Sequence, residues 1–238
     1  MAYAGTMGRR RGRGSGLPGR LIWIALSLAG AGLAGAPVAY MLWPAPRAIS
    51  PDAPSLPITI GGVAFNVPPA AIRFKVQRRP GAQARVDLTF VWPSLTPPDL
   101  TIKPLPTDKP EVTDRLFVTI ATSDSTLAPA ERLKAIYPRY ADAAPIVGAD
   151  GLSLQGFREG SAYQGEDLIL EPSAPERFLL RCTRQVALTP AMCLHERRIG
   201  GADVTVRFPR AWLDDWRSVA DGIDRLIAGF RPALVPPI

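Results

Sequence analysis

The chain contains few of the residues from which catalytic and metal centres are built. Its 238 residues include one histidine, His195, and two cysteines, Cys182 and Cys193. Any mechanism that activates a nucleophile through histidine would therefore depend on His195. The sequence has no nucleophile elbow, zincin helix or phosphate-cradling glycine loop. One histidine and two cysteines also fall short of the four ligands of a structural zinc site. The sequence favours a non-catalytic protein and predicts no metal site and no cofactor.

Negative charge is absent from the first twenty residues, which contain five arginines. Removing these five from the 28 basic residues of the chain leaves 23, against 21 acidic residues. The formal net charge of +7 therefore resides mainly in the tail and not on a folded surface. Because nucleic-acid binding needs a clustered basic face, we expect no nucleic-acid partner.

Charged residues are also absent from Leu21 to Trp43. A helix over residues 21–43, at ~1.5 Å per residue, crosses a hydrocarbon core of about 30 Å. By the positive-inside rule, the arginines before it keep the N-terminus in the cytoplasm and the rest is exported. We predict a single-pass anchor in the inner (cytoplasmic) membrane, with the lipid bilayer as partner of residues 21–43 and a periplasmic C-terminal domain. A signal peptide cleaved near Ala36 is the alternative, and it exports the domain too.

Composition divides the chain into five expected parts. Five prolines between residues 44 and 57 favour extended backbone, which suits a spacer. The parts are a basic cytoplasmic tail (1–20), a transmembrane helix (21–43), a Pro-rich stalk (44–57), an extracytoplasmic α+β domain (58–232) and a C-terminal tail (233–238).

Alternating apolar residues and glycine pairs predict the strands of the domain. The expected strands are a hairpin at 58–60 and 63–67, two strands within 72–92 around Pro80-Gly81, and strands at 116–122, 152–158, 163–171, 177–184, 192–199 and 204–208. Residues 93–110 contain six prolines and predict a long ordered loop, either a contact surface or a crossover packed on the sheet edge.

Two segments have the period of a helix. Leu133, Ile136 and Tyr137 share one helical face after Pro129, and apolar residues from Trp212 to Phe230 recur at steps of three and four. Together with the strands, these helices predict an α+β fold in which two helices pack on an antiparallel sheet.

The candidate sites depend on a few side chains. In an oxidising compartment, Cys182 and Cys193 on adjacent predicted strands indicate a disulfide, and two buried thiols are the alternative. His195 lies in mid-strand, where we expect it to face solvent. Paired carboxylates for glycosidase-type chemistry would come from Glu159, Glu166, Asp167 and Glu171.

Five basic residues precede the carboxylate of Asp87 without an acidic residue among them: Arg73, Lys75, Arg78, Arg79 and Arg85. They are the candidate contact with an anionic partner, such as lipid headgroups or cell-wall polymer. A solvated hairpin tip is the alternative.

The order of basic tail, anchor, stalk and an opening Ile58-Thr59-Ile60-Gly61-Gly62 that ends at Val67-Pro68 resembles uncharacterised single-pass membrane-anchored proteins of proteobacteria. The resemblance implies a location and no activity. We expect a membrane-anchored envelope protein whose periplasmic domain binds another envelope protein or assembles a complex. The alternative is an envelope enzyme that acts on cell-wall or lipid substrates through the carboxylates and His195.

Overall fold

The structure is a computed structural model that describes residues 50–99, 113–124, 126–142, 144–184 and 190–231. Within these ranges, none of the helices has the length and apolar character needed to span a membrane. The tail 1–20, the expected span 21–43 and the C-terminal tail 233–238 lie outside the described residues, as does much of the proline-rich interval 93–110.

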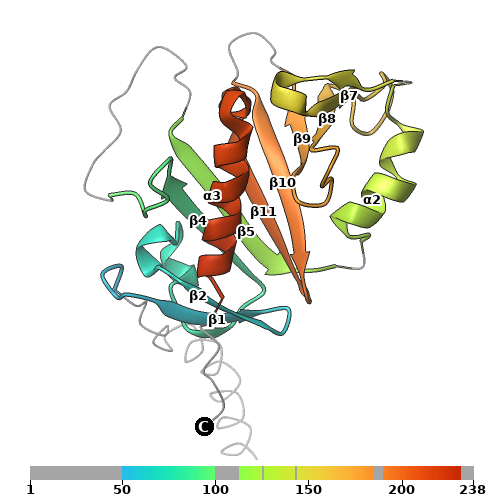
Figure 1. Cartoon of the computed structure of the whole chain (residues 1–238). Coiled ribbons are helices and arrows are strands. Elements are labelled where there is room, and N and C mark those ends of the chain that lie inside the picture. Colours follow the sequence, from blue (N-terminus) through green and yellow to red (C-terminus); the bar gives the residue numbers. More distant parts are fainter. Residues whose placement is uncertain (1–49, 100–112, 125, 143, 185–189, 232–238) are drawn as a thin grey trace, which may run out of the picture. The chain divides into compact units, whose positions relative to one another are not determined.

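Eight strands form one antiparallel sheet, the main sheet, in the order β4-β5-β11-β10-β9-β8-β7-β6 (Figure 1). The bounds are β4 Arg85–Val91, β5 Arg115–Thr122, β6 Ile146–Val147, β7 Ser153–Gly156, β8 Glu166–Leu170, β9 Leu179–Thr183, β10 Met192–Ile199 and β11 Ala202–Pro209. The predicted antiparallel α+β class is correct. β5 lies between β4, the strand before it in the chain, and β11, which comes from a distant part of the sequence. Periodicity alone does not predict this order of strands.

A smaller sheet of order β2-β1-β3 lies beside it, made of β1 (Leu56–Ile60), β2 (Val63–Val67) and β3 (Gly81–Ala82). β1 and β2 form the predicted hairpin over Gly61-Gly62, whereas β3 runs parallel to β1. Leu56 is fully buried in β1. β1 therefore begins two residues before the strand predicted at 58–60.

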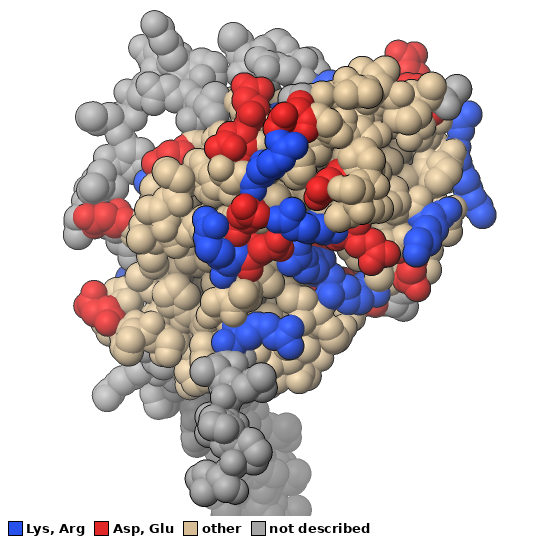
Figure 2. Space-filling view, in the orientation of Figure 1, with Lys and Arg blue, Asp and Glu red and all other residues tan. Residues whose placement is uncertain are grey.

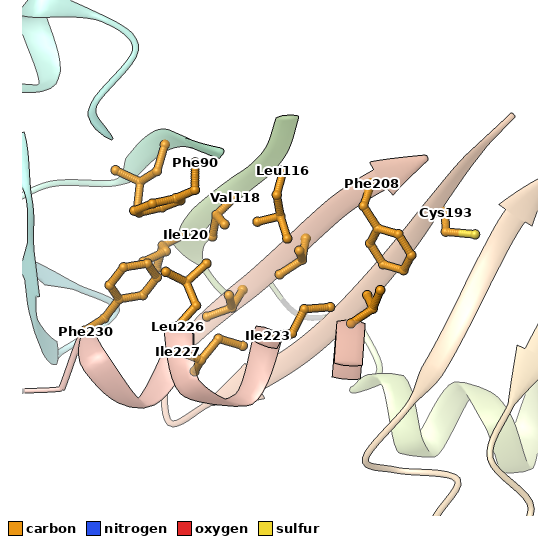
Figure 3. Close-up of a cluster of buried hydrophobic side chains, with 14 of the residues drawn as sticks. Phe90, Leu116, Val118, Ile120, Cys193, Phe208, Ile223, Leu226, Ile227 and Phe230 are labelled. Carbon is orange, nitrogen blue, oxygen red and sulfur yellow. The ribbon is translucent and has the colours of Figure 1, made fainter. Parts of the chain in front are cut away.

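The C-terminal helix α3 (Trp216–Gly229) covers one face of the main sheet and follows a 3₁₀ segment, Arg210–Asp215. Its apolar stripe, including Ile223 and Ile227, packs on strand residues such as Val118 (Figure 3). The stripe has the spacing of three and four that keeps one helical face buried. Phe230, just after the helix, lies against Phe90 with the ring centroids 5.8 Å apart.

The short helix α2 (Pro129–Ala135) and the 3₁₀ turn Tyr137–Arg139 belong to the opposite face of the main sheet. Alternate strand side chains point to opposite faces, so Ile169 and Leu180 join the α3 core while Leu168 and Leu179 pack with Tyr137. The two helices therefore pack on different sides of the sheet.

The prediction of the first strand within 72–92 is wrong over most of its length. Between Ile72, which bridges to Leu88, and Pro80 the chain forms a 3₁₀ turn at Lys75–Gln77. Phe74 and Val76 of this alternating segment are exposed, so the period of two does not mark a buried face here. Another 3₁₀ turn, Pro69–Ala71, comes before it.

The two Gly-Gly turns of the hairpins meet each other. A Cβ on Gly201 would overlap the carbonyl oxygen of Gly61, and one on Gly61 would overlap the carbonyl of Gly201. Only glycine allows two backbones to approach this closely. The turn between β1 and β2 is thereby packed against the turn between β10 and β11.

Candidate binding surface

α2 covers only part of its side of the main sheet. Its apolar contacts, with those of the turn after it, are to residues of β8 and β9, and its Arg132 pairs with Glu196 of β10. No described helix packs on the same side of β4, β5 and β11. We term this surface the open face. Its central residues are Phe117, Thr119, Thr205 and Arg207, and Asp87 and Thr89 of β4, which are both buried, form its border.

The register of the strands places these residues in two rows across the sheet. Phe117 lies between Thr89 on β4 and Arg207 on β11. In the next row, Thr119 lies between Asp87 and Thr205. Side chains directly opposite one another in such rows are within about 5 Å at their Cβ atoms, so each row acts as one local surface.

Two arginines lie beside the ring of Phe117. The guanidinium of Arg73 is 5.2 Å from the centroid of that ring and 5.6 Å from the ring of Phe74. Arg207 is directly opposite Phe117 in the register and is exposed. Within the described residues neither arginine has an ion-pair partner. A guanidinium stacked on an aromatic ring keeps its N–H donors free for a carboxylate.

Asp87 holds the border of the open face together. Its carboxylate accepts hydrogen bonds from Gln77 Nε2 at 3.0 Å, Arg85 Nη2 at 2.7 Å and Thr119 Oγ1 at 2.8 Å. Burial opposes ionisation of this group, but the hydrogen bonds from Arg85, Gln77 and Thr119 outweigh it and lower the pKa of Asp87 to about 2. The charge of Asp87 is therefore balanced by its hydrogen-bond partners, and it adds little negative potential to the open face.

The five basic residues singled out in the sequence have different roles. Arg78 is buried and donates to the carbonyl oxygen of Ile72 at 2.8 Å, so it is a structural residue. Arg85 pairs with Asp87. Arg73 lies on the open face, and Lys75 and Arg79 are exposed on the turn beside it.

His195 is not a surface residue, contrary to the expectation from its mid-strand position. Its side chain is on the α3 side of β10, fully buried, with the ring 6.1 Å from that of Phe178. Burial is the main cause that lowers the pKa of His195 to about 4, aided by the nearby charge of Arg197. The ring is therefore neutral at pH 7. The sequence does contain a signal for this burial. His195 comes two residues after Cys193 on β10, so both side chains point to the same face, and Cys193 is also buried.

Three of the four carboxylates of the enzymatic alternative, Glu166, Asp167 and Glu171, pair with arginines. Asp167 pairs with Arg184 at 2.7 Å and with Arg210 at 2.6 Å. Glu166 pairs with Arg181 at 3.0 Å. Glu171 is 3.6 Å from Arg177, and Glu159 is exposed. In the part of the chain that the structure describes, no three His, Cys, Asp or Glu side chains are grouped so as to hold a metal ion.

Cys182 and Cys193 form a disulfide between directly opposite positions of β9 and β10. Both residues are buried in the α3-side core. The bond joins two strands that are already hydrogen-bonded neighbours, and it makes the pairing between them covalent.

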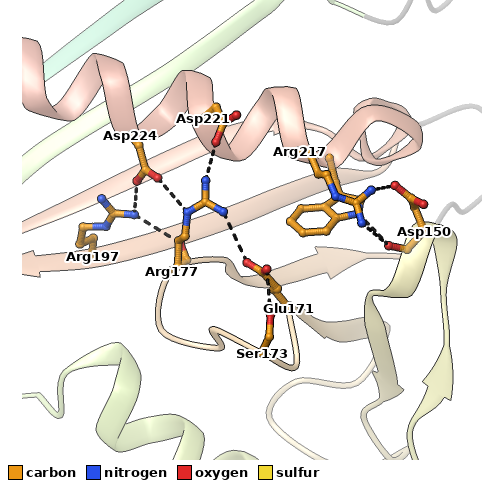
Figure 4. A network of polar contacts seen from close by, with 9 residues as sticks. Asp150, Glu171, Ser173, Arg177, Arg197, Arg217, Asp221 and Asp224 are labelled. Atoms are coloured by element: carbon orange, nitrogen blue, oxygen red, sulfur yellow. Dashed lines mark hydrogen bonds and ion pairs between the residues drawn. The ribbon is translucent and has the colours of Figure 1, made fainter.

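The surface on the α3 side differs from the open face because its charges are matched. Arg177 is 2.5 Å from Asp221 and 3.1 Å from Asp224, and Arg197 is 2.7 Å from the same Asp224 (Figure 4). Figure 2 shows positive and negative side chains interspersed across this side. Such a surface favours neither a strongly acidic nor a strongly basic partner.

Comparisons with known proteins identify a fold and no family. No family model and no curated protein matches the sequence. An immunity protein of the type IV secretion system of Stenotrophomonas maltophilia has a similar structure, with a TM-score of 0.52 and 12% identity over 80% of this chain and 100% of that chain. At this identity the likeness concerns the fold alone.

A second solved structure is that of the iron-regulated outer membrane lipoprotein FrpD of Neisseria meningitidis. It has a TM-score of 0.39 and 10% identity over 78% of this chain and 96% of that chain. A score at that level carries no argument about this chain.

Proposed function

We propose that the protein is a membrane-anchored envelope protein whose periplasmic domain binds another envelope protein through the open face. The observation that carries the proposal is the arrangement of Arg73 and Arg207 on either side of Phe117. Arginine and aromatic side chains are enriched at protein interfaces and among the residues that contribute most of the binding energy. Phe117 and Arg207 stand on strands of the main sheet, and the backbone N–H of Arg73 donates to the carbonyl oxygen of Asp87 at 2.9 Å, so the surface is preformed.

Separate observations support the proposed location of the protein in the cell envelope. The uncharged run from Leu21 to Trp43 follows five arginines, which is the pattern of an anchor with a cytoplasmic N-terminus. The Cys182–Cys193 disulfide is typical of a domain that folds in an oxidising compartment such as the periplasm.

The enzymatic alternative receives less support. His195 is buried and Asp167 is held between two arginines, so neither group is presented to a substrate on an accessible surface. A general base or acid must be within hydrogen-bond reach of the reacting group.

Site-specific photocrosslinking in the producing cell tests the interface. A photoreactive amino acid replaces Arg207 or Phe117 in the full-length protein, and the control position is Arg225, which is exposed on α3 on the other side of the sheet. We expect one discrete adduct from positions 207 and 117 and none from 225. Adducts from position 225 alone, or the same adduct from all three positions, would overturn the assignment to the open face.

Topology is tested independently with a C-terminal tag. In spheroplasts, added protease should digest the tag from a membrane-bound, full-length species. A protected tag would place the domain in the cytoplasm and contradict the proposed location, whatever the crosslinking result.

A further inference from the structure

The turn around Lys75 is a second exposed feature, which adjoins the open face where Arg73 lies 5.6 Å from the ring of Phe74. Phe74 and Val76 have exposed fractions of 50% and 77%, although both are large apolar residues. Lys75 between them and Arg79 after them are also exposed, without an ion-pair partner among the described residues. We term Phe74, Lys75, Val76 and Arg79 the basic tip. Exposed apolar side chains that gather on one turn are candidates for a contact site.

The charge of the basic tip is not compensated within its own segment. No Asp or Glu occurs in the sequence between Asp52 and Asp87. Asp87 itself is buried and bound to Arg85, so it does not neutralise Lys75 or Arg79. The tip therefore presents apolar and cationic groups together, which are the two components of an interfacial membrane contact.

Hydrogen bonds hold the tip in its outward conformation. Gln83 Nε2 donates to the carbonyl oxygens of Gln77 at 3.2 Å and Arg79 at 2.6 Å. The side chain of Gln77 exchanges two hydrogen bonds with Asp87, one with the carboxylate and one with the backbone N–H, each 3.0 Å long. At the other end of the segment, the backbone N–H of Arg73 donates to the carbonyl oxygen of Asp87 at 2.9 Å. With the backbone held at both ends, Phe74 and Val76 remain exposed.

The topology places the tip at the end of the small sheet where the chain enters the domain. β1 and β3 are parallel, with Ile58 opposite Gly81, so both strands begin at the same end. The predicted anchor and stalk lead into β1, and the basic tip leads into β3. Residues 44–55 between the predicted span and β1 would span about 37 Å as polyproline II at ~3.1 Å per residue. A bilayer holding the anchor is within reach of the tip.

We propose that the basic tip docks on the anionic surface of the bilayer in which the chain is anchored. Phe74 and Val76 enter the interfacial region, while Lys75 and Arg79 contact lipid phosphates with their stems along the apolar boundary. This proposal rests on the anchor of the proposed function and does not depend on the protein partner. It gives the domain a second attachment beside the anchor and limits its orientation over the membrane.

Single-cysteine labelling tests the proposal, because the two native cysteines form a disulfide and leave the introduced thiol alone to react. Full-length Val76→Cys and Val147→Cys proteins are labelled with an environment-sensitive fluorophore and reconstituted into phosphatidylcholine bilayers with or without phosphatidylglycerol. Val147 on the edge strand β6 is the matched control, since it is the same residue type and 86% exposed.

We expect the label at 76 to be quenched at least twofold by lipids with a headgroup-proximal nitroxide in anionic bilayers. The label at 147 should respond to aqueous iodide only. Adding Lys75→Glu with Arg79→Glu should abolish the lipid quenching at 76. A charge-matched change at α2 and the 3₁₀ turn after it, Lys134→Glu with Arg139→Glu, should preserve the quenching.

Iodide quenching at 76 equal to that at 147 in anionic bilayers would overturn the proposal, and so would equal lipid quenching in neutral and anionic bilayers. Failure of the full chain to enter bilayers would instead contradict the anchor. In that case the label at 76 is measured with added anionic vesicles, and the absence of any response there would overturn the tip proposal as well.

Discussion

The imidazole of His195 donates through Nδ1 to the carbonyl oxygen of Leu179 at 3.1 Å, while its Nε2 is buried without a partner. The ring is closed in by Phe178, which in turn stacks on Trp216 of α3 with the centroids 5.4 Å apart. A proton on Nε2 would therefore place a charge in this core with no acceptor to receive its hydrogen bond, which is strongly unfavourable.

The first prediction concerns pH. The pKa of His195 is about 4 in the folded chain and 6.5 in a solvated histidine. Because the pKa of His195 is lower in the folded chain than in the unfolded chain, its contribution to the free energy of unfolding is complete above pH 6.5. This contribution is lost as the pH falls toward 4. The loss should approach about 3 kcal/mol in the free energy of unfolding, measured by urea titration in mild detergent.

The variant His195→Phe provides the control for this pH dependence. It retains an aromatic ring beside Phe178 and removes the single histidine of the chain. Its free energy of unfolding should vary little between pH 7 and pH 5. A wild-type protein that is equally insensitive to pH over this interval would contradict the buried, neutral histidine.

The second prediction concerns the disulfide. Cys182 and Cys193 are separated by 11 positions, and closing a loop of that size contributes about 3 kcal/mol in the chain-entropy model. The double variant Cys182→Ala with Cys193→Ala should lose a stability of that order in urea unfolding. The wild type should also shift on a reducing gel while the variant does not, and identical unfolding midpoints would refute the prediction.

The third prediction concerns the contact between the glycine turns. Gly201→Ala places a Cβ on the backbone of Gly61, so the turns must separate, and we expect a loss of more than about 2 kcal/mol. Gly229→Ala is the control, because a Cβ there meets no atom within 4 Å and reduces the freedom of the unfolded chain. It should stabilise by about 0.5 kcal/mol. Similar effects of the two substitutions would contradict the close approach.

The fourth prediction concerns Asp87, whose folded pKa of about 2 lies below the ordinary 3.8. The contribution of ionised Asp87 to the free energy of unfolding is present above pH 3.8 and is lost as the pH falls through 2. Asp87→Asn should therefore be less stable than wild type by about 2 kcal/mol at pH 7. The difference should shrink toward pH 2, and a difference that persists unchanged would show that lost shape, and not charge, is responsible.

The sequence predicts best where the pattern and the burial agree. The glycine pairs at 61–62 and 200–201 turn between apolar strands, and both hairpins form as expected. The stripe from Trp216 to Phe230 forms α3, while the residues just before it take a 3₁₀ conformation after Pro209. In each case, nearby residues determine the local conformation.

Prediction fails where burial depends on distant partners. Phe74 and Val76 alternate as a strand would, but no described element packs on them and Gln77 turns toward Asp87 instead. The solvent-facing prediction for His195 failed because α3 covers its side of β10. The open face was not predictable either, since Phe117 and Arg207 become neighbours only through the pairing of β5 with β11.

The contact between Gly61 and Gly201 also constrains the order in which the chain can mature. The two residues are 140 positions apart, and the N–H of Asn66 on β2 donates to the carbonyl oxygen of Phe230 at 2.6 Å. The β1–β2 hairpin is therefore completed by a residue that directly follows α3. Until α3 has been made and delivered, the apolar residues of β1 and β2 lack this covering, and a chain cut short before α3 leaves them open to aggregation or to a chaperone.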